Sequence, residues 1–150
     1  MKKIILILSF LMAIIPCNLF ARDFPSKNDI YWLSQNIYHE ARGESLYGKF
    51  MIGVVTLERL RCGKWGNNVK SVVTAPHQFS WYHKNKNYTI AENESWTLSQ
   101  YVAIFTLSIF PEKSHSGIMY YHNKNVHPLW ASKMKKITEV GNHIFYKEVK

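Results

Sequence analysis

The chain has 150 residues, of which 47% are hydrophobic, 15% aromatic and 19% charged. This composition is typical of a folded globular domain and excludes a disordered or collagen-like chain. Nineteen Lys and Arg residues against ten Asp and Glu residues give a formal net charge of +9. We therefore expect an acidic partner or an anionic surface. The sequence contains no internal repeat or interdomain linker, which predicts a single domain.

The N-terminal residues have the pattern of an export signal. Lys2 and Lys3 precede the apolar run 4–15, and Ala21 closes a cleavage site after Leu19-Phe20. A short positive segment, an apolar run and a small residue at the cleavage site are the parts of a secretory signal peptide. We assign this signal to residues 1–21.

The exported domain is then 22–150, and we expect it in the periplasm, the cell wall or the extracellular space. The apolar run is interrupted by Pro16 and is shorter than the roughly 20 residues that a membrane span needs, so we expect no stable membrane insertion after cleavage. A retained N-terminal anchor is the alternative. Only Cys62 stays with the exported domain, which excludes an internal disulfide.

The first elements are predicted to be two helices joined by a corner. Asn28 is the expected N-cap of the first helix, and Gly43 is expected to end it in the left-handed conformation. Spacings of three and four residues define its apolar stripe: Ile30, Leu33, Ile37 and Ala41. The second helix starts at Glu44 or Ser45, and its stripe consists of Leu46, Phe50, Val54 and Leu57. Gly53 within it predicts the close approach of another backbone.

The remaining elements change from helix to strand along the chain. A short helix is predicted at 69–73, and a long one at 95–110 with Leu98, Val102, Phe105 and Ile109 on its buried face. Strands are predicted at 118–121 and 143–146, and between them Pro128 opens a brief helix that carries Trp130 and Met134. The sequence thus predicts a predominantly helical α+β domain with a small β element.

Glu40 is the main candidate for chemistry. It follows Ile37 by three residues, so the first helix places its carboxylate on the apolar stripe. Burial and the negative end of the helix dipole both raise the pKa of a carboxyl group, as a general acid requires. Glu44 across the corner is the candidate second carboxylate. The alternative is that Glu40 forms a structural ion pair with Arg42 or another cation.

Other types of site have little support. His39-Glu40 lacks the second histidine of a zinc protease, because position 43 is glycine, and the other histidines show no tight ligand spacing. We therefore expect neither a metal nor another cofactor. The export signal and the lack of a recognisable motif argue against a nucleic-acid partner.

Aromatic and polar residues further along the chain are typical of carbohydrate binding, because flat rings can pack on sugars while polar groups bond their hydroxyls. The alternative is that some are core residues, in particular Phe79 and one of the two adjacent tyrosines, since neighbouring strand residues face opposite sides. The candidate substrate-binding residues are Gln78, Phe79, Ser80, Trp81, Tyr120, Tyr121, His122 and His143.

Several blocks of sequence resemble the bacterial cell-wall hydrolase family of the spore-cortex-lytic (SleB-like) type. The resemblance runs from about Ile30 to Tyr146, and Glu58 departs from it where relatives commonly carry asparagine. The matching blocks are 37–44 with Gly48 and Val54-Val55, Val72-Val73 with 78–81, 117–122, 128–131 and 141–146.

This resemblance implies a lysozyme-like domain related to lytic transglycosylases, which cleaves the glycan strand of peptidoglycan without a metal. It also implies that Glu40 is the catalytic acid. A hydrolytic muramidase that uses Glu40 and Glu44 is one alternative, and a peptidoglycan-binding module without catalytic activity is another. We expect a monomer whose partner is peptidoglycan.

Overall fold

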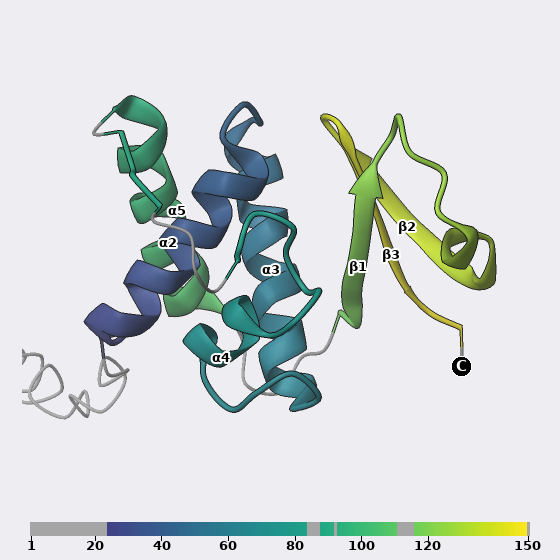
Figure 1. The fold of residues 1–150 in the computed structure, drawn as a ribbon, viewed down its shortest axis with the longest axis horizontal. Coiled ribbons are helices and arrows are strands. Elements are labelled where there is room, and N and C mark those ends of the chain that lie inside the picture. The colour runs from purple at the N-terminus through teal and green to yellow at the C-terminus, as the bar shows by residue number, and fades with distance from the viewer. Residues whose placement is uncertain (1–23, 84–87, 92, 111–115, 150) are drawn as a thin grey trace, which may run out of the picture.

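The computed structural model describes residues 24–83, 88–91, 93–110 and 116–149, and the predicted signal peptide lies outside these ranges. Helices form one side of the domain and a three-stranded sheet the other, as Figure 1 shows. The elements are α2 (Lys27–Ala41), α3 (Leu46–Cys62), α4 (Val69–Thr74), α5 (Glu94–Ile109), β1 (Ile118–Asn123), the 3-10 helix η3 (Leu129–Lys133), β2 (Met134–Val140) and β3 (His143–Glu148). The predicted α+β class is confirmed. Within these ranges, no helix has the length and apolar character of a membrane span.

Helix α2 buries Leu33, Ile37 and Ala41 of the predicted stripe and half-buries Ile30, but its two ends differ from the prediction. Ser26, not Asn28, is the N-cap, and its hydroxyl accepts a hydrogen bond from the Asp29 amide at 3.0 Å. At the other end the chain leaves the helix at Arg42 in the right-handed conformation, so the left-handed cap predicted at Gly43 is wrong.

A buried lysine takes over the role of that cap. The Nζ atom of Lys49 donates hydrogen bonds to the carbonyl oxygens of Ala41 at 2.7 Å and Arg42 at 2.9 Å, and to the Ser95 hydroxyl at 3.3 Å. Lys49 is only 2% exposed. Its positive charge satisfies carbonyls at the negative end of the α2 dipole. This bond network fixes where α2 ends, one residue after Glu40.

Helices α3 and α5 pack against each other at Gly53. A Cβ atom at Gly53 would lie 3.1 Å from Cγ2 and Oγ1 of Thr106. The predicted close approach is therefore present, but the partner is a side chain and not a backbone. In α3, Val54 and Leu57 are buried as predicted, whereas Leu46 in the first turn is 57% exposed.

The predicted face of α5 is right only in part: Val102 is buried and Leu98 half-buried, but the other two residues are not. Phe105 and Ile109 are 55% and 45% exposed. The helix is apolar on most of its circumference, so the spacing of its large residues did not identify the face that packs. That face includes polar residues whose hydroxyls bond the carbonyl four residues earlier, as Thr106 does at 2.7 Å. The buried residues of α5 are Trp96, Ser99, Val102, Ala103 and Thr106.

The sheet has the strand order β1-β3-β2, with both pairs antiparallel. Strand β1 lies next to α3 (Figure 1). Because Tyr121 pairs with Phe145 and Tyr120 with Tyr146, the adjacent tyrosines face opposite sides of the sheet. Strand β2 was not predicted: η3 carries Trp130 as expected, but Met134 begins the strand and does not belong to the helix.

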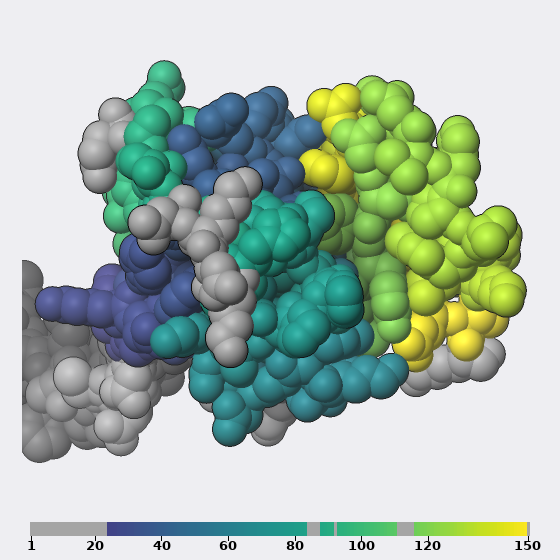
Figure 2. Space-filling model, viewed as in Figure 1, coloured from purple at the N-terminus to yellow at the C-terminus, as the bar shows by residue number. Residues whose placement is uncertain are grey.

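A carboxylate joins the helices to the sheet. Glu44, in the corner between α2 and α3, accepts hydrogen bonds from the backbone amide of Asn142 at 3.2 Å and from its side-chain amide at 2.9 Å. Gly141 makes room for this carboxylate, since a Cβ there would lie 1.7 Å from Glu44 Oε2. In Figure 2 the blue atoms of this corner meet the yellow atoms of the β2–β3 turn at the top of the view.

We predict that Lys49→Met destabilises the domain by about 1.5–3 kcal/mol, because the thioether chain fills similar space but leaves buried carbonyls without a donor. Urea unfolding followed by circular dichroism measures this change. The matched control is Lys27→Met, at an exposed position in the first turn of α2. An unfolding free energy of Lys49→Met equal to that of the control would contradict the capping role.

Candidate active site

Glu40 lies at the junction between the helices and the sheet. Its Oε2 atom accepts a hydrogen bond of 2.6 Å from the hydroxyl of Tyr121 in β1. It also lines a cavity of about 380 Å³ together with Tyr38, His39, Arg42 and Gly43. The carboxyl group is therefore largely removed from water but still open to a ligand on one side.

Burial raises the pKa of Glu40, although the Tyr121 hydrogen bond and the charge of Arg59 act in the opposite direction. Burial, together with the charge of Glu40 and the hydrogen bond to it, raises the pKa of Tyr121 well above its ordinary value. Tyr121 therefore stays a hydrogen-bond donor. A carboxyl group with a raised pKa holds its proton to higher pH than an exposed glutamate does. This is the property predicted from the position of Glu40 on the apolar stripe.

Arg42 does not neutralise Glu40. Its guanidinium lies 5.7 Å from the ring centroid of Tyr38, and the described residues show no ion pair between Arg42 and Glu40. Arg42 instead lowers the pKa of Tyr38 through a side-chain hydrogen bond. The alternative prediction named Arg42 or another cation as the partner of Glu40; the Arg42 pair is wrong, whereas the charge of another cation, Arg59, does act on Glu40.

Arg59 is a buried cation whose charge acts on Glu40, and sequence reasoning did not select it. Its Nε atom donates to the carbonyl oxygen of Met119 at 2.9 Å and its Nη1 atom to that of Gln78 at 3.1 Å. The guanidinium also lies 4.8 Å from the ring centroid of Phe79. Arg59 thus ties α3 to β1 and to the segment after α4, while its charge lowers the pKa of Glu40 less than burial raises it.

Glu44 has a different environment from Glu40. Its side chain is 8% exposed, both carboxylate oxygens accept from the Asn142 amide, and Nδ1 of His143 lies 3.9 Å from Oε1. The structure therefore places Glu44 in the joint between the α2–α3 corner and the β2–β3 turn. Glu40 thus accepts its hydrogen bond from Tyr121, whereas Glu44 accepts hydrogen bonds from Asn142.

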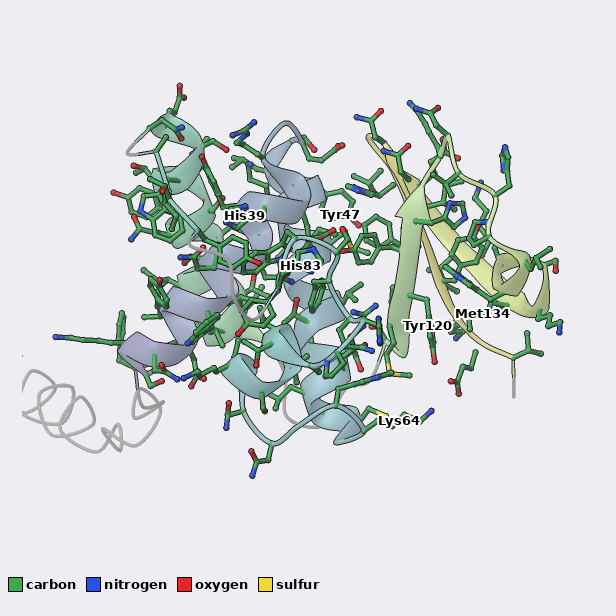
Figure 3. All side chains as sticks on the ribbon, viewed as in Figure 1. His39, Tyr47, Lys64, His83, Tyr120 and Met134 are labelled. Atoms are coloured by element: carbon green, nitrogen blue, oxygen red, sulfur yellow. The ribbon has the colours of Figure 1, made fainter. Side chains whose placement is uncertain are left out.

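His39 and Trp81 form a wall beside Glu40. Their rings stack with centroids 4.4 Å apart and planes 18° apart. The indole Nε1 donates to Asn36 Oδ1 at 2.8 Å, and Asn36 in turn donates to the Thr56 hydroxyl at 2.9 Å. Burial lowers the pKa of His39, which favours its neutral form. Figure 3 shows His39 among the helices. The sequence signal that could have selected His39 as a site residue was its position directly before Glu40.

Residues 78–80, which also belong to the predicted substrate-binding residues, pack partly into the core. Phe79 is 4% exposed and lies under Arg59, as the alternative interpretation held. Gln78 contributes its backbone carbonyl to Arg59. Ser80 lines a separate cavity of about 590 Å³ that also includes His77 and Tyr82.

The candidates on the sheet are divided between its two faces. Tyr121 and His143 lie on the face toward the helices, where their rings are 5.3 Å apart. Tyr120 and His122 lie on the other face, where both rings contact Trp130. Figure 3 shows Tyr120 on the sheet, away from the helix that carries His39.

The part of the chain that the structure describes contains no group of three or more His, Cys, Asp or Glu residues arranged to hold a metal.

Comparison with known sequences finds relatives of one type. The spore cortex-lytic enzyme of Bacillus subtilis (strain 168) is 30% identical over 120 residues, which cover 80% of this chain and 38% of the relative. That of Halalkalibacterium halodurans is 27% identical over 123 residues, which cover 80% and 35%. The chain thus spans less than half the length of these relatives.

Comparison with solved structures also finds proteins of this type. The catalytic domain of the Bacillus cereus SleB protein matches with a TM-score of 0.62 and 26% identity, covering 81% of this chain and 91% of that one. The catalytic domain of the germination-specific lytic transglycosylase SleB from Bacillus anthracis matches with a TM-score of 0.65 and 24% identity, covering 83% and 98%. These matches confirm the predicted lysozyme-like fold.

The family model described as Cell Wall Hydrolase matches residues 43–146, beginning three residues after Glu40. This match covers more than half of the chain and extends from the α2–α3 corner to β3. The chain belongs to the cell wall hydrolase family.

Proposed function

We propose that this chain cleaves the glycan strand of peptidoglycan between N-acetylmuramic acid and N-acetylglucosamine, as a lytic transglycosylase with Glu40 as its catalytic acid. The observation that carries the proposal is a carboxyl group with a raised pKa on the wall of a cavity, with Tyr121 as its hydrogen-bond donor. Membership of the cell wall hydrolase family supports the substrate class.

In this mechanism one carboxyl group serves both steps. Protonated Glu40 donates its proton to the glycosidic oxygen as the bond from this oxygen to C1 of the muramic sugar breaks. The resulting carboxylate then accepts the proton of the muramic 6-hydroxyl as that oxygen bonds to C1. The product is a 1,6-anhydro end, Glu40 is protonated again, and no water is consumed. Tyr121 stabilises the carboxylate between the two steps through its hydrogen bond.

The environment of Glu44 favours this mechanism over hydrolysis. A muramidase normally needs a second carboxylate that activates water or stabilises the sugar cation. Both oxygens of Glu44 accept hydrogen bonds from Asn142, so this carboxylate is occupied at the joint between the helices and the sheet. We therefore assign Glu44 a structural role and Glu40 the catalytic one.

The stacked rings of His39 and Trp81 are the best candidates for contact with sugars near Glu40, because His39 lines the same cavity. The domain acts outside the cytoplasm, where its substrate lies, and its net positive charge favours a wall that carries carboxylates. We propose that it acts as a monomer and without a cofactor.

We predict that Glu40→Gln keeps the fold but lowers the release of soluble fragments from purified sacculi by a factor of about 10² or more, because an amide cannot donate the proton. The matched control, Glu44→Gln, keeps an acceptor for Asn142 and should retain activity within roughly threefold. Mass spectrometry of the fragments should show anhydro ends, which are one water lighter than reducing ends. Activity of Glu40→Gln, or reducing ends alone, would contradict the mechanism.

A second prediction concerns pH. A general acid works while protonated, so kcat/KM falls as pH rises through the pKa of Glu40. Tyr121→Phe removes a hydrogen bond that stabilises the carboxylate, so it raises this pKa and moves the alkaline limb of the pH profile to higher pH. Tyr120→Phe, on the other face of the sheet, is the control and should leave the limb in place. A limb that moves to lower pH in Tyr121→Phe would overturn the assignment.

A further inference from the structure

A second cavity, distinct from that of Glu40, lies at the end of the sheet where β1 begins and β3 ends. It has a volume of about 490 Å³. The residues that line it are Ser116, Gly117, Met119, Lys135 of β2, Lys147 and Glu148 of β3, and Val149. The proposed reaction at Glu40 makes no use of this cavity.

The two lysines are direct neighbours across the strands. Lys135 and Lys147 are register partners in the β2–β3 pair, so they project from the same face of the sheet. Like charges at directly opposite positions destabilise a sheet. Neither lysine forms an ion pair with any residue that the structure describes. The nearby carboxylate of Glu148 accepts a hydrogen bond of 2.6 Å from Tyr120.

Protection of the sheet edge explains only one of the two charges. Strand β2 is an edge strand, and lysines on an edge prevent pairing with other chains. Strand β3 is the central strand, where Lys147 has no such role. The neighbouring Lys136 has a partner, because its Nζ atom lies 3.0 Å from Glu139 Oε2. Two lysines therefore share the cavity with a single carboxylate, that of Glu148, which already accepts the Tyr120 hydrogen bond, and one positive charge is left in excess.

A buried carboxylate holds Ser116, one of the residues that line the cavity, in place. Glu58 is 3% exposed, and its Oε1 atom accepts hydrogen bonds of 2.8 Å from both the amide and the hydroxyl of Ser116. The hydroxyl oxygen of Ser116 in turn accepts from the Ile118 amide at 3.2 Å. Glu58 is the position at which the sequence departs from the pattern that it resembles. It fixes the chain that leads into β1 and thereby shapes the cavity.

We propose that this cavity binds a carboxylate of the peptide stem carried by the muramic sugar, an inference that rests on the proposed function. Lys147 lies two residues beyond Phe145, the register partner of Tyr121, so it is roughly 7 Å further along the same face. An extended stem of four or five residues reaches roughly 15 Å. The uncharged glycan offers the lysines no counter-ion, whereas the stem peptide does.

The test compares three soluble glycan strands: one with free stem carboxylates, one with these carboxylates amidated, and one stripped of peptide. The variant is Lys135→Gln/Lys147→Gln, and the control is Lys27→Gln/Lys70→Gln, which removes the same charge from exposed positions in α2 and α4. At low salt we expect the variant to raise KM roughly fivefold on free-carboxylate strands, with kcat unchanged. On the other two strands it should equal wild type.

The outcomes separate the inference from the proposed function. If wild type releases no anhydro fragments from any strand, the proposed function fails. If wild type cleaves all three but the variant matches the control on each, the inference alone is overturned. An equal loss on amidated strands would also overturn it, because the lysines would not then recognise charge. Thermal unfolding provides a further check: removal of the like-charge pair should not lower the Tm of the variant, whereas a structural role would lower it.

Discussion

The burial of one carboxyl group at the junction of helices and sheet is the constraint on which the site depends. Three sets of contacts position Glu40 at this junction. Lys49 ends α2 one residue later by binding its last carbonyls, Glu44 fastens the β2–β3 turn to the next corner, and β1 brings the Tyr121 hydroxyl to within 2.6 Å. If the contacts of Lys49 or Glu44 were lost, the carboxyl group would gain water and its pKa would fall toward the ordinary value, whereas loss of the Tyr121 hydrogen bond alone would raise the pKa further.

Two glutamates four positions apart thus have different surroundings, and for this reason we propose different roles for them. Glu40 has one neutral donor and a cavity, whereas Glu44 has two amide donors and a histidine beside it. Glycine at position 141 is part of this division, since any side chain there would occupy the place of the Glu44 carboxylate. Glu44 thus joins the helices to the sheet, and Glu40 is the residue that we propose for the chemistry.

The sequence indicated the parts of this arrangement that depend on local spacing. The position of Glu40 on the apolar stripe of α2 followed from helical periodicity, and so did the class of the fold. The contact of Glu44 with Asn142 spans 98 positions, so no local pattern could reveal it. The cap by Lys49 was missed because lysine is rarely buried. In α5, apolar residues lie on several faces of the helix, so their spacing did not show which face packs against the core. Strand β2 was missed because Lys135 and Lys136 interrupt its apolar pattern.

The central claim is that the Glu40 carboxyl keeps its proton above the ordinary glutamate pKa of 4.5. The most direct test is a pH titration of the side-chain carboxyl carbons by ¹³C NMR, with the Glu40 signal assigned by its absence in Glu40→Gln. The account predicts that this signal titrates at a pH above 4.5, in the folded protein. A midpoint at or below 4.5 would show a solvated or ion-paired carboxylate and would contradict the assignment of Glu40 as the acid.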